Sequence, residues 1–243
     1  DADDIWHPDK LHKQFNYLHK NPGTDVVSCR VNFKGPKENE GMLTYVNETN
    51  QYISHDEISV NRFSELQVIN PTILFRKDIV RKNGFYREGE FPEDYEMYLR
   101  WLEAGVRYHK LAENLLDWYD HKNRLTRTDE RYSTDAFYRI KAEYLARYLK
   151  KNTKHFPNIW AWGAGNLSKQ RIQYLIDMGV SIEKYIDVDP KKINNKEIIH
   201  YEKVPDPGSC FIVSYVNNRG KRSEIRNFLD SRKYKEGADY IMA

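Results

Sequence analysis

Hydrophobic positions recur at helical spacing in several segments of the chain, and short runs rich in β-branched residues lie between them. Residues 10–20 carry an apolar residue at every third or fourth position, which predicts a helix, and an Asn-Pro-Gly turn ends it. Residues 25–31 are rich in valine and predict a strand. Residues 40–62 show no firm period, so we expect irregular structure there, with helix only near residues 59–65.

The middle of the chain predicts one further strand and three helices. Residues 70–76 are typical of a strand in a buried sheet, and residues 77–82 of a short helix closed by Asn-Gly. Pro92 fits the first position of another helix, whose apolar face continues until Gly105 ends it. Residues 134–151 predict a long amphipathic helix.

After residue 152 the pattern changes to short strands that alternate with helices. Strands are expected over residues 159–162, 182–186, 211–215 and 240–242, and helices over residues 168–178 and 221–232. This alternation, with a Gly-Ala-Gly turn after the first strand, is typical of a doubly wound α/β unit. We therefore predict two domains, residues 1–152 and residues 153–243.

Composition and charge narrow the class of protein. The 243 residues are 40% hydrophobic, enough to bury a core. Basic residues exceed acidic ones by 39 to 36 and are spread along the chain, so we expect no nucleic-acid partner. The apolar runs are far shorter than the roughly 20 residues of a membrane helix, so we expect no transmembrane segment. Cys29 and Cys210 are typical of free thiols in a reducing compartment, which predicts a cytoplasmic protein, with peripheral membrane association as an alternative.

Three carboxylates, those of Asp1, Asp3 and Asp4, precede the first predicted helix. Closely spaced oxygen donors of this kind suit Mg²⁺ or Mn²⁺. Aspartate is also common before a helix as a cap and as a partner of the helix dipole. The residues alone leave a metal site and a solvated acidic turn open.

A second acidic motif, Glu93-Asp94, lies in the first turn of the helix that follows Pro92. A carboxylate on a rigid helix start can accept a proton from an attacking hydroxyl, which is the work of a general base. The positive end of a helix also favours acidic residues that have no catalytic role. The sequence alone leaves both interpretations open.

Together the two motifs resemble family 2 glycosyltransferases with the GT-A fold. The pattern D-x-D-D-x-x-x-P-x-[KR]-L-x-x-Q from Asp1 is similar to their metal-binding motif, and E-D-[YF]-[ED]-x-x-x-R from Glu93 to their catalytic signature. The resemblance implies that Asp1 and Asp3 hold Mn²⁺ or Mg²⁺ on the diphosphate of a UDP-sugar, with Asp3 as the more direct ligand. It also implies that Asp94, with Glu93 beside it, is the base of an inverting single displacement onto a saccharide or other hydroxyl acceptor.

The segment from Asp120 resembles the part of these enzymes that closes over the diphosphate. By position His121 completes the metal shell, although a single histidine on a polar loop is more commonly just exposed. Arg124 and Arg127 are alternative phosphate partners, because a guanidinium binds phosphate oxygens in a bidentate way. Asp120 stands where the family usually has a basic residue, which argues against a phosphate contact at that position.

The C-terminal part resembles a dinucleotide-binding fingerprint with one departure. Gly163-Ala164-Gly165 and Asp187 have the expected spacing, but Ser168 replaces the third glycine. A structural Rossmann-like module is therefore expected, with nucleotide binding as the open alternative. The motifs W-[GN]-A-G-x-x-x-x-R, [ID]-D-x-D-x-x-K and G-x-D-[YF] resemble a β-1,3-N-acetylglucosaminyltransferase-like group over nearly the whole chain, which implies transfer of GlcNAc or another hexose.

The resemblance implies an α/β fold class, the C-terminal part of a GT-A fold followed by a small Rossmann-like domain. In the GT-A fold a βαβ half that binds the nucleotide precedes the first acidic motif, and this chain begins at that motif. We therefore expect a fragment that does not bind a UDP-sugar tightly and is inactive by itself. Two other classes stay open: a non-catalytic binding or assembly protein with this fold, and a nucleotide-dependent oxidoreductase built on the second domain.

Overall fold

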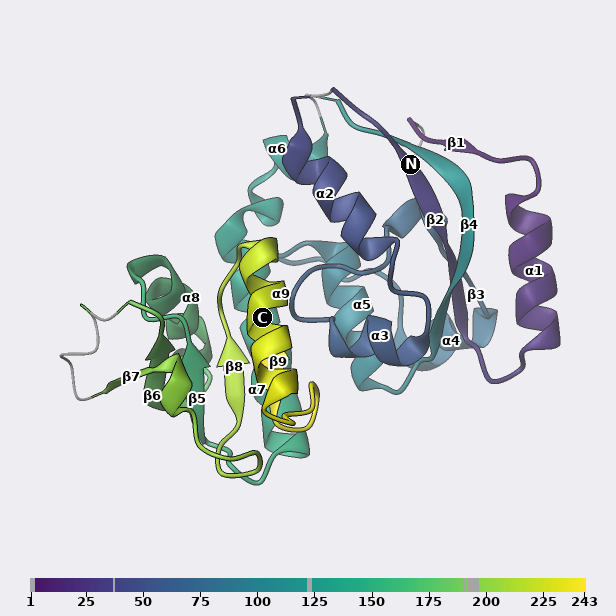
Figure 1. Cartoon of the computed structure of the whole chain (residues 1–243). Helices are drawn as coiled ribbons and strands as arrows, with labels where there is room; N and C mark the ends of the chain where they lie inside the picture. Colours follow the sequence, from purple (N-terminus) through teal and green to yellow (C-terminus); the bar gives the residue numbers. More distant parts are fainter. Residues whose placement is uncertain (1–2, 37, 122–123, 190, 192–196) are drawn as a thin grey trace. The chain divides into compact units, whose positions relative to one another are not determined.

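The structure is a computed structural model that describes residues 3–36, 38–121, 124–189, 191 and 197–243 (Figure 1). Within these residues the fold is mixed α/β, with two sheets and nine α-helices. The chain divides into two compact units, residues 1–62 with 66–137 and residues 63–65 with 138–243. A compact unit is not by itself a piece that folds alone, so the domain boundary after residue 152 stays a prediction.

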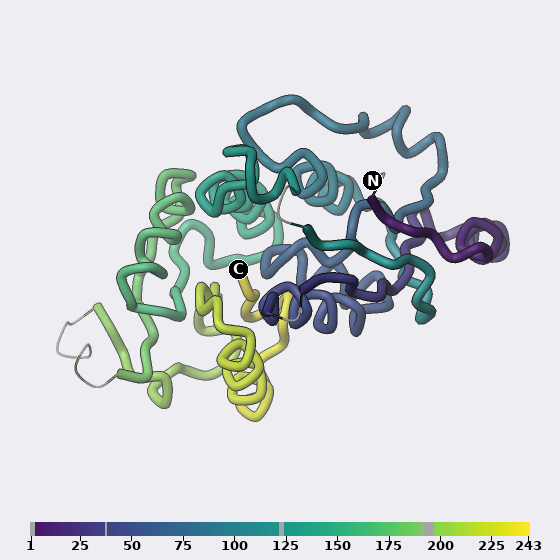
Figure 2. The backbone as a smooth tube through the Cα atoms, turned by 90° about the horizontal axis from the view of Figure 1, so that it is seen from above, coloured from purple at the N-terminus to yellow at the C-terminus, as the bar shows by residue number. Residues whose placement is uncertain are grey.

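The first unit is built on a four-stranded sheet in the order β1-β4-β2-β3. The long strands β2 (Val26–Lys34) and β4 (Tyr108–Tyr119) run parallel, whereas β1 (Ile5–Trp6) and β3 (Leu74–Phe75) pair antiparallel at the two edges. Although β1 and β4 are far apart in the sequence, they lie side by side (Figures 1 and 2). This pairing brings Asp3 and Asp4 to the end of β4.

Several helices and two 3₁₀ turns accompany this sheet. They are α1 (Lys10–Lys20), α2 (Glu40–Thr49), α3 (His55–Val60), η1 (Asn70–Thr72), α4 (Lys77–Asn83), α5 (Glu93–Glu103), α6 (Leu125–Thr128) and η2 (Glu130–Tyr132). The predicted helices over residues 10–20 and 77–82, and the one after Pro92, are confirmed. The predicted buried strand over residues 70–76 is wrong, because a 3₁₀ turn occupies its first half and leaves a two-residue edge strand.

The expectation of irregular structure over residues 40–62 is also wrong, because α2 and α3 lie there. A capping box begins α3: Ser54 Oγ accepts a hydrogen bond from the Glu57 backbone N–H, and the Glu57 carboxylate accepts one from the Ser54 N–H. These reciprocal bonds satisfy donors that a helix start leaves unpaired. The Ser-x-x-Glu pattern was therefore a readable signal for this helix.

The second unit has a five-stranded sheet in the order β7-β6-β5-β8-β9, and all neighbouring strands are parallel. Its elements are the C-terminal part of α7 (Thr134–Asn152), β5 (Asn158–Trp162), α8 (Asn166–Asp177), β6 (Ser181–Asp187), β7 (Ile198–His200), η3 (Tyr201–Lys203), β8 (Ile212–Ser214), α9 (Arg219–Ser231) and β9 (Tyr240–Met242). The strands and helices predicted after residue 152 are confirmed to within two residues at each end. The strand order reverses between β5 and β8.

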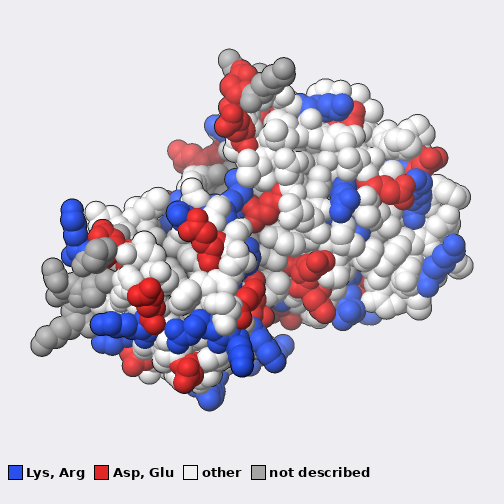
Figure 3. All heavy atoms as spheres, in the orientation of Figure 1, with Lys and Arg blue, Asp and Glu red and all other residues white. Residues whose placement is uncertain are grey.

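Surface chemistry agrees with the mixed composition. On the face shown in Figure 3, basic and acidic side chains are interspersed over the first unit. Among the described residues, no helix is both long and apolar enough to cross a membrane. Cys29 and Cys210 are free and buried.

Glu96 and Arg100, the last two defined positions of the signature that begins at Glu93, form a buried ion pair. Arg100 Nε lies 2.9 Å from Glu96 Oε1, and both side chains are less than a tenth exposed. The guanidinium also donates to the backbone carbonyls of Asn83, Gly84 and Phe85. Helix α4 ends at Asn83, and Gly84 follows it with φ +74°. The bonds from Arg100 to these carbonyls therefore link the end of α4 to α5. These two residues therefore hold the helix whose first turn carries the acidic pair.

Arg100→Met leaves the Glu96 carboxylate buried without its principal partner. We expect a loss of about 3–5 kcal/mol in the free energy of unfolding, measured by urea denaturation. The control is Arg87→Gln, because Arg87 is 60% exposed and lies 3.5 Å from the same carboxylate. An exposed pair of this kind contributes about 1 kcal/mol or less. Equal losses for the two variants would contradict the role given to Arg100.

Candidate active site

Asp3 and His121, two of the residues predicted to bind metal, lie together at the end of β4. His121 Nε2 is 2.9 Å from Asp3 Oδ2, and both side chains are partly exposed. Burial by itself raises the pKa of Asp3, but the hydrogen bond with His121 and the charge of Arg124 outweigh it and leave that pKa below its ordinary value. The ionised carboxylate of Asp3 and the imidazole of His121 are donors that a divalent cation can bind.

Asp3 and His121 are the predicted metal ligands that the structure describes. Asp1, the other predicted ligand, lies outside the described residues. Within the residues that are described, no group of three or more His, Cys, Asp or Glu side chains is placed to hold a metal ion. The role of Asp1 as a ligand therefore stays a prediction.

Asp4, the third carboxylate of the first motif, fixes the chain to the sheet. Its Oδ1 accepts a hydrogen bond of 3.0 Å from the backbone N–H of Tyr119, the last residue of β4. Burial raises the pKa of Asp4 above its ordinary value. Its neighbour Asp3 is thereby held near His121, a positioning role that the spacing of the motif did not reveal.

The two candidate phosphate-binding arginines differ in their partners. Arg127 Nη2 donates to the buried Asp120 carboxylate at 2.7 Å, and its Nη1 donates to the His121 carbonyl at 2.6 Å. Arg124 instead stacks on Trp118, with Cζ 4.1 Å from the ring centroid. Asp120, which departs from the family pattern, therefore neutralises Arg127 and leaves Arg124 as the better placed cation for a phosphate.

Asp94 lies in the first turn of α5. The helix begins at Glu93, and Pro92 occupies the N-cap rather than the first helical position that we expected. Asp94 Oδ1 accepts a hydrogen bond of 2.7 Å from the Tyr95 N–H. Burial, and then the charge of Glu93, raise the pKa of Asp94 to about 6, against the opposing influence of that hydrogen bond and of Arg124. A pKa near 6 is suited to a general base at neutral pH.

Tyr132 holds the neighbouring carboxylate. Its hydroxyl lies 2.7 Å and 2.6 Å from the two oxygens of Glu93. Burial, followed by this hydrogen bond, raises the pKa of Tyr132 far above its ordinary value, so the hydroxyl remains a donor. Tyr132 belongs to a short 3₁₀ turn, and no pattern in the sequence singled it out.

Arg124 links the two acidic motifs. Its positive charge lowers the pKa values of Asp3, Asp4 and Asp94, so its guanidinium lies within electrostatic reach of both motifs. Asp3 and His121 therefore lie together, Glu93 and Asp94 share the first turn of α5, and Arg124 acts electrostatically on both motifs. These are five of the seven site residues predicted from the sequence. Of the other two, Arg127 is paired with Asp120, and Asp1 lies outside the described residues.

Three curated proteins are similar to this chain, and all three are named as glycosyltransferases. The O-antigen biosynthesis glycosyltransferase WbnJ of Escherichia coli is 30% identical over 155 residues, which are 63% of this chain and 56% of that protein. An uncharacterised glycosyltransferase of Methanocaldococcus jannaschii is 26% identical over 163 residues, 67% of this chain and 53% of its own length. The bifunctional glycosyltransferase pgtA of Dictyostelium discoideum is 24% identical over 128 residues, 44% of this chain and 17% of its own length.

These relatives support a glycosyltransferase family for the chain. The chain spans about half the length of the first two. No protein-family model matches it.

Glu93→Gln is expected to lower the pKa of Asp94 from about 6 toward its ordinary value of 3.8, because it removes the neighbouring negative charge. The measurement is a carboxyl ¹³C NMR titration. Tyr132→Phe is the matched control, because it removes the hydrogen bond to Glu93 and keeps the charge. An Asp94 pKa that does not move in Glu93→Gln would contradict the electrostatic account.

The raised pKa of Asp94 also makes the free energy of unfolding depend on pH. The folded state binds the Asp94 proton more tightly than the unfolded state, so the stability that Asp94 contributes is fully present below pH 3.8 and is lost as the pH rises through about 6. Asp94→Asn removes this loss. At pH 7 the variant is expected to be more stable than the wild type by about 1–2 kcal/mol, with no such gain at pH 3.5, as measured by urea denaturation.

Proposed function

We propose that this chain carries the catalytic base and the metal ligands of an inverting, metal-dependent glycosyltransferase of family 2. The proposal takes the first unit as the C-terminal part of a GT-A fold and the second as a Rossmann-like accessory domain. The donor is a UDP-sugar, the transferred group is GlcNAc or another hexose, and the acceptor is a saccharide or another hydroxyl compound. The observation that carries the proposal is the shared reach of Arg124 to Asp3 and Asp94.

Asp94 takes the proton in the proposed reaction. The acceptor hydroxyl gives its proton to the Asp94 carboxylate while its oxygen attacks the anomeric carbon of the donor. The bond from that carbon to the diphosphate oxygen breaks, and the nucleoside diphosphate leaves with the electron pair. A pKa of about 6 keeps Asp94 mostly ionised at pH 7 while it remains basic enough to accept the proton.

The leaving group needs positive charge. Asp3, His121 and Asp1 are the residues that would hold Mn²⁺ or Mg²⁺, and such a cation stabilises the charge that develops on the diphosphate. Arg124 supplies a further cation from the chain itself. Its cation–π contact with Trp118 holds the guanidinium over the ring, and a guanidinium can bind phosphate oxygens in a bidentate way.

Asp94→Asn tests the proposal in the native polypeptide that contains this sequence. With a panel of UDP-sugars and Mn²⁺, we expect kcat for sugar transfer to fall by about 10²–10⁴-fold, because the attack loses its base. The dissociation constant for the donor stays within about twofold, because the base acts on the acceptor.

The matched control is Asp78→Asn, which changes an exposed aspartate of α4 paired with Lys82. It is expected to leave kcat unchanged. Full activity of Asp94→Asn would exclude Asp94 as the base. Donor binding without transfer by the wild type, over a broad acceptor panel, would favour the non-catalytic binding or assembly protein.

A further inference from the structure

Cations from three helices of the second unit gather around the ring of Tyr138. Lys141 Nζ of α7 lies 4.1 Å from the ring centroid, and Arg171 Cζ of α8 lies 4.6 Å from it. Arg222 of α9 acts electrostatically on both Lys141 and the Tyr138 hydroxyl. Glu65 is the carboxylate that acts on the same two groups. We refer to Lys141, Arg171, Arg222 and Glu65 as the basic cluster.

Positive charge exceeds negative charge in the basic cluster. Lys141 is 5% exposed and Arg222 is 1% exposed. Glu65 is paired with Arg222, whose Nη2 lies 3.8 Å from its Oε2, and with Arg219, whose Nη2 lies 2.6 Å from its Oε1. Burial lowers the pKa of Lys141 to about 7; Glu65 opposes this shift, and the two guanidinium groups of the cluster add to it. An ammonium group buried as deeply as that of Lys141 is costly to keep charged, and a bound anion would lower this cost.

Arg171 of the basic cluster and Ser214 at the end of β8 each carry an unsatisfied buried polar atom. Within the described part of the chain, Arg171 Nε and Ser214 Oγ are buried and have no hydrogen-bond partner. Ser214, which is 1% exposed, is the last residue of β8. Native proteins rarely leave such donors unpaired, so each of them calls for a partner.

The basic cluster lies where the strand order of the second sheet reverses. Tyr215 follows β8 directly, and its ring centroid is 6.3 Å from that of Tyr138. Ser168, at the start of α8, donates a hydrogen bond of 3.3 Å to the Tyr215 carbonyl. In open parallel sheets, ligands bind outside the carboxyl ends of the strands at the point of reversal, which here lies between β5 and β8.

The turn after β5 argues against a dinucleotide at this position. The two oxygens of Asp187 accept hydrogen bonds of 3.0 Å from the N–H groups of Ala164 and Asp189. In a dinucleotide site this carboxylate would bind a ribose hydroxyl. Because Asp187 binds backbone N–H groups instead, this edge of the sheet is suited to a negatively charged group rather than to a ribose.

We propose that the basic cluster binds a small phosphate-bearing anion at the carboxyl ends of β5 and β8. Arg171 is half-buried, and the side chains of Glu65 and Arg219 are 24% and 27% exposed. The cluster is therefore accessible to solvent at these residues. Phosphate oxygens accept hydrogen bonds from guanidinium and ammonium groups, which are the donors gathered here. This proposal does not rest on the transferase function.

The test is calorimetric titration of the full chain with inorganic phosphate, pyrophosphate and AMP. Lys141→Met and Arg171→Gln are each expected to weaken phosphate binding about tenfold or more, because each removes a charged donor. Without phosphate, Lys141→Met is expected to unfold at the same or a higher temperature than the wild type, since it removes a buried cation. A purely structural role for Lys141 predicts a lower temperature.

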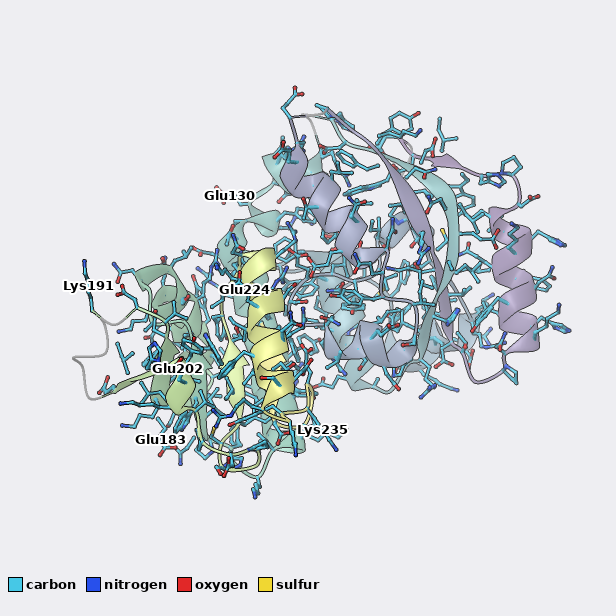
Figure 4. The ribbon with its side chains drawn as sticks, viewed as in Figure 1. Glu130, Glu183, Lys191, Glu202, Glu224 and Lys235 are labelled. Atoms are coloured by element: carbon cyan, nitrogen blue, oxygen red, sulfur yellow. The ribbon has the colours of Figure 1, made fainter. Side chains whose placement is uncertain are left out.

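Lys235→Gln is the matched control. Lys235 is exposed and lies beyond the carboxyl end of α9, as labelled in Figure 4, whereas Arg222 is in the first turns of that helix. The control is expected to bind phosphate like the wild type. Tighter binding of AMP than of phosphate would identify a nucleotide as the source of the phosphate group, and equal binding would identify the phosphate alone.

Sulfate separates the role of Lys141 from the titration of phosphate, because sulfate keeps its charge between pH 6 and 8. Its affinity is expected to fall as the pH rises through about 7, where Lys141 loses its proton, and this dependence is absent in Lys141→Met. The absence of binding by all four anions would overturn the proposal, as would equal affinities of the wild type, Lys141→Met and Arg171→Gln. If Lys141→Met does not fold, Arg171→Gln decides.

Discussion

The candidate active site depends on one cation placed among carboxylates of like charge. Asp3, Asp4, Glu93 and Asp94 come from two motifs far apart in the sequence, and their mutual repulsion opposes any fold that gathers them. Arg124 acts on three of the four, and Trp118 holds it in place through stacking. Burial, and then the charge of Glu93, keep the pKa of Asp94 raised despite Arg124. A site of this kind favours a further cation and keeps one carboxyl group poised to exchange a proton.

Local patterns predicted those parts of the fold whose stability is itself local. The helix of residues 10–20 and the helix that carries Asp94 have a helical apolar period and clear end signals, and both form as expected. The strands of the second unit are short apolar runs bounded by turns, and they too form. Residues 40–62 have a weak period because their helices bury few residues, so a periodicity argument missed them.

Contacts between distant segments set the limit of prediction for the site. The helix start that carries Asp94 is readable, because the acidic pair follows a proline and precedes an apolar face. The hydrogen bonds from Tyr132 to Glu93 and from Arg127 to Asp120 could not be predicted, because they join segments through turns without periodicity. They nevertheless decide which carboxylate can act as a base and which arginine can meet a phosphate. Sequence reasoning singled out the candidate reactive groups and missed the side chains that hydrogen-bond to them.

The two sheets show the same physical rule with opposite signs of charge. In the second sheet, parallel strands place the residues that follow them at one edge, so polar side chains from distant segments meet there. In the first unit, antiparallel pairing of β1 with β4 brings Asp3 and Asp4 to the end of β4, and the first turn of α5 adds Glu93 and Asp94. The groups gathered there are mainly carboxylates, and burial raises the pKa of Asp94. Near the ends of β5 and β8 they are mainly cations, and burial lowers the pKa of Lys141. Burial disfavours the charged form in both cases, so a cation would favour the ionised form of the first group of side chains and an anion that of the second.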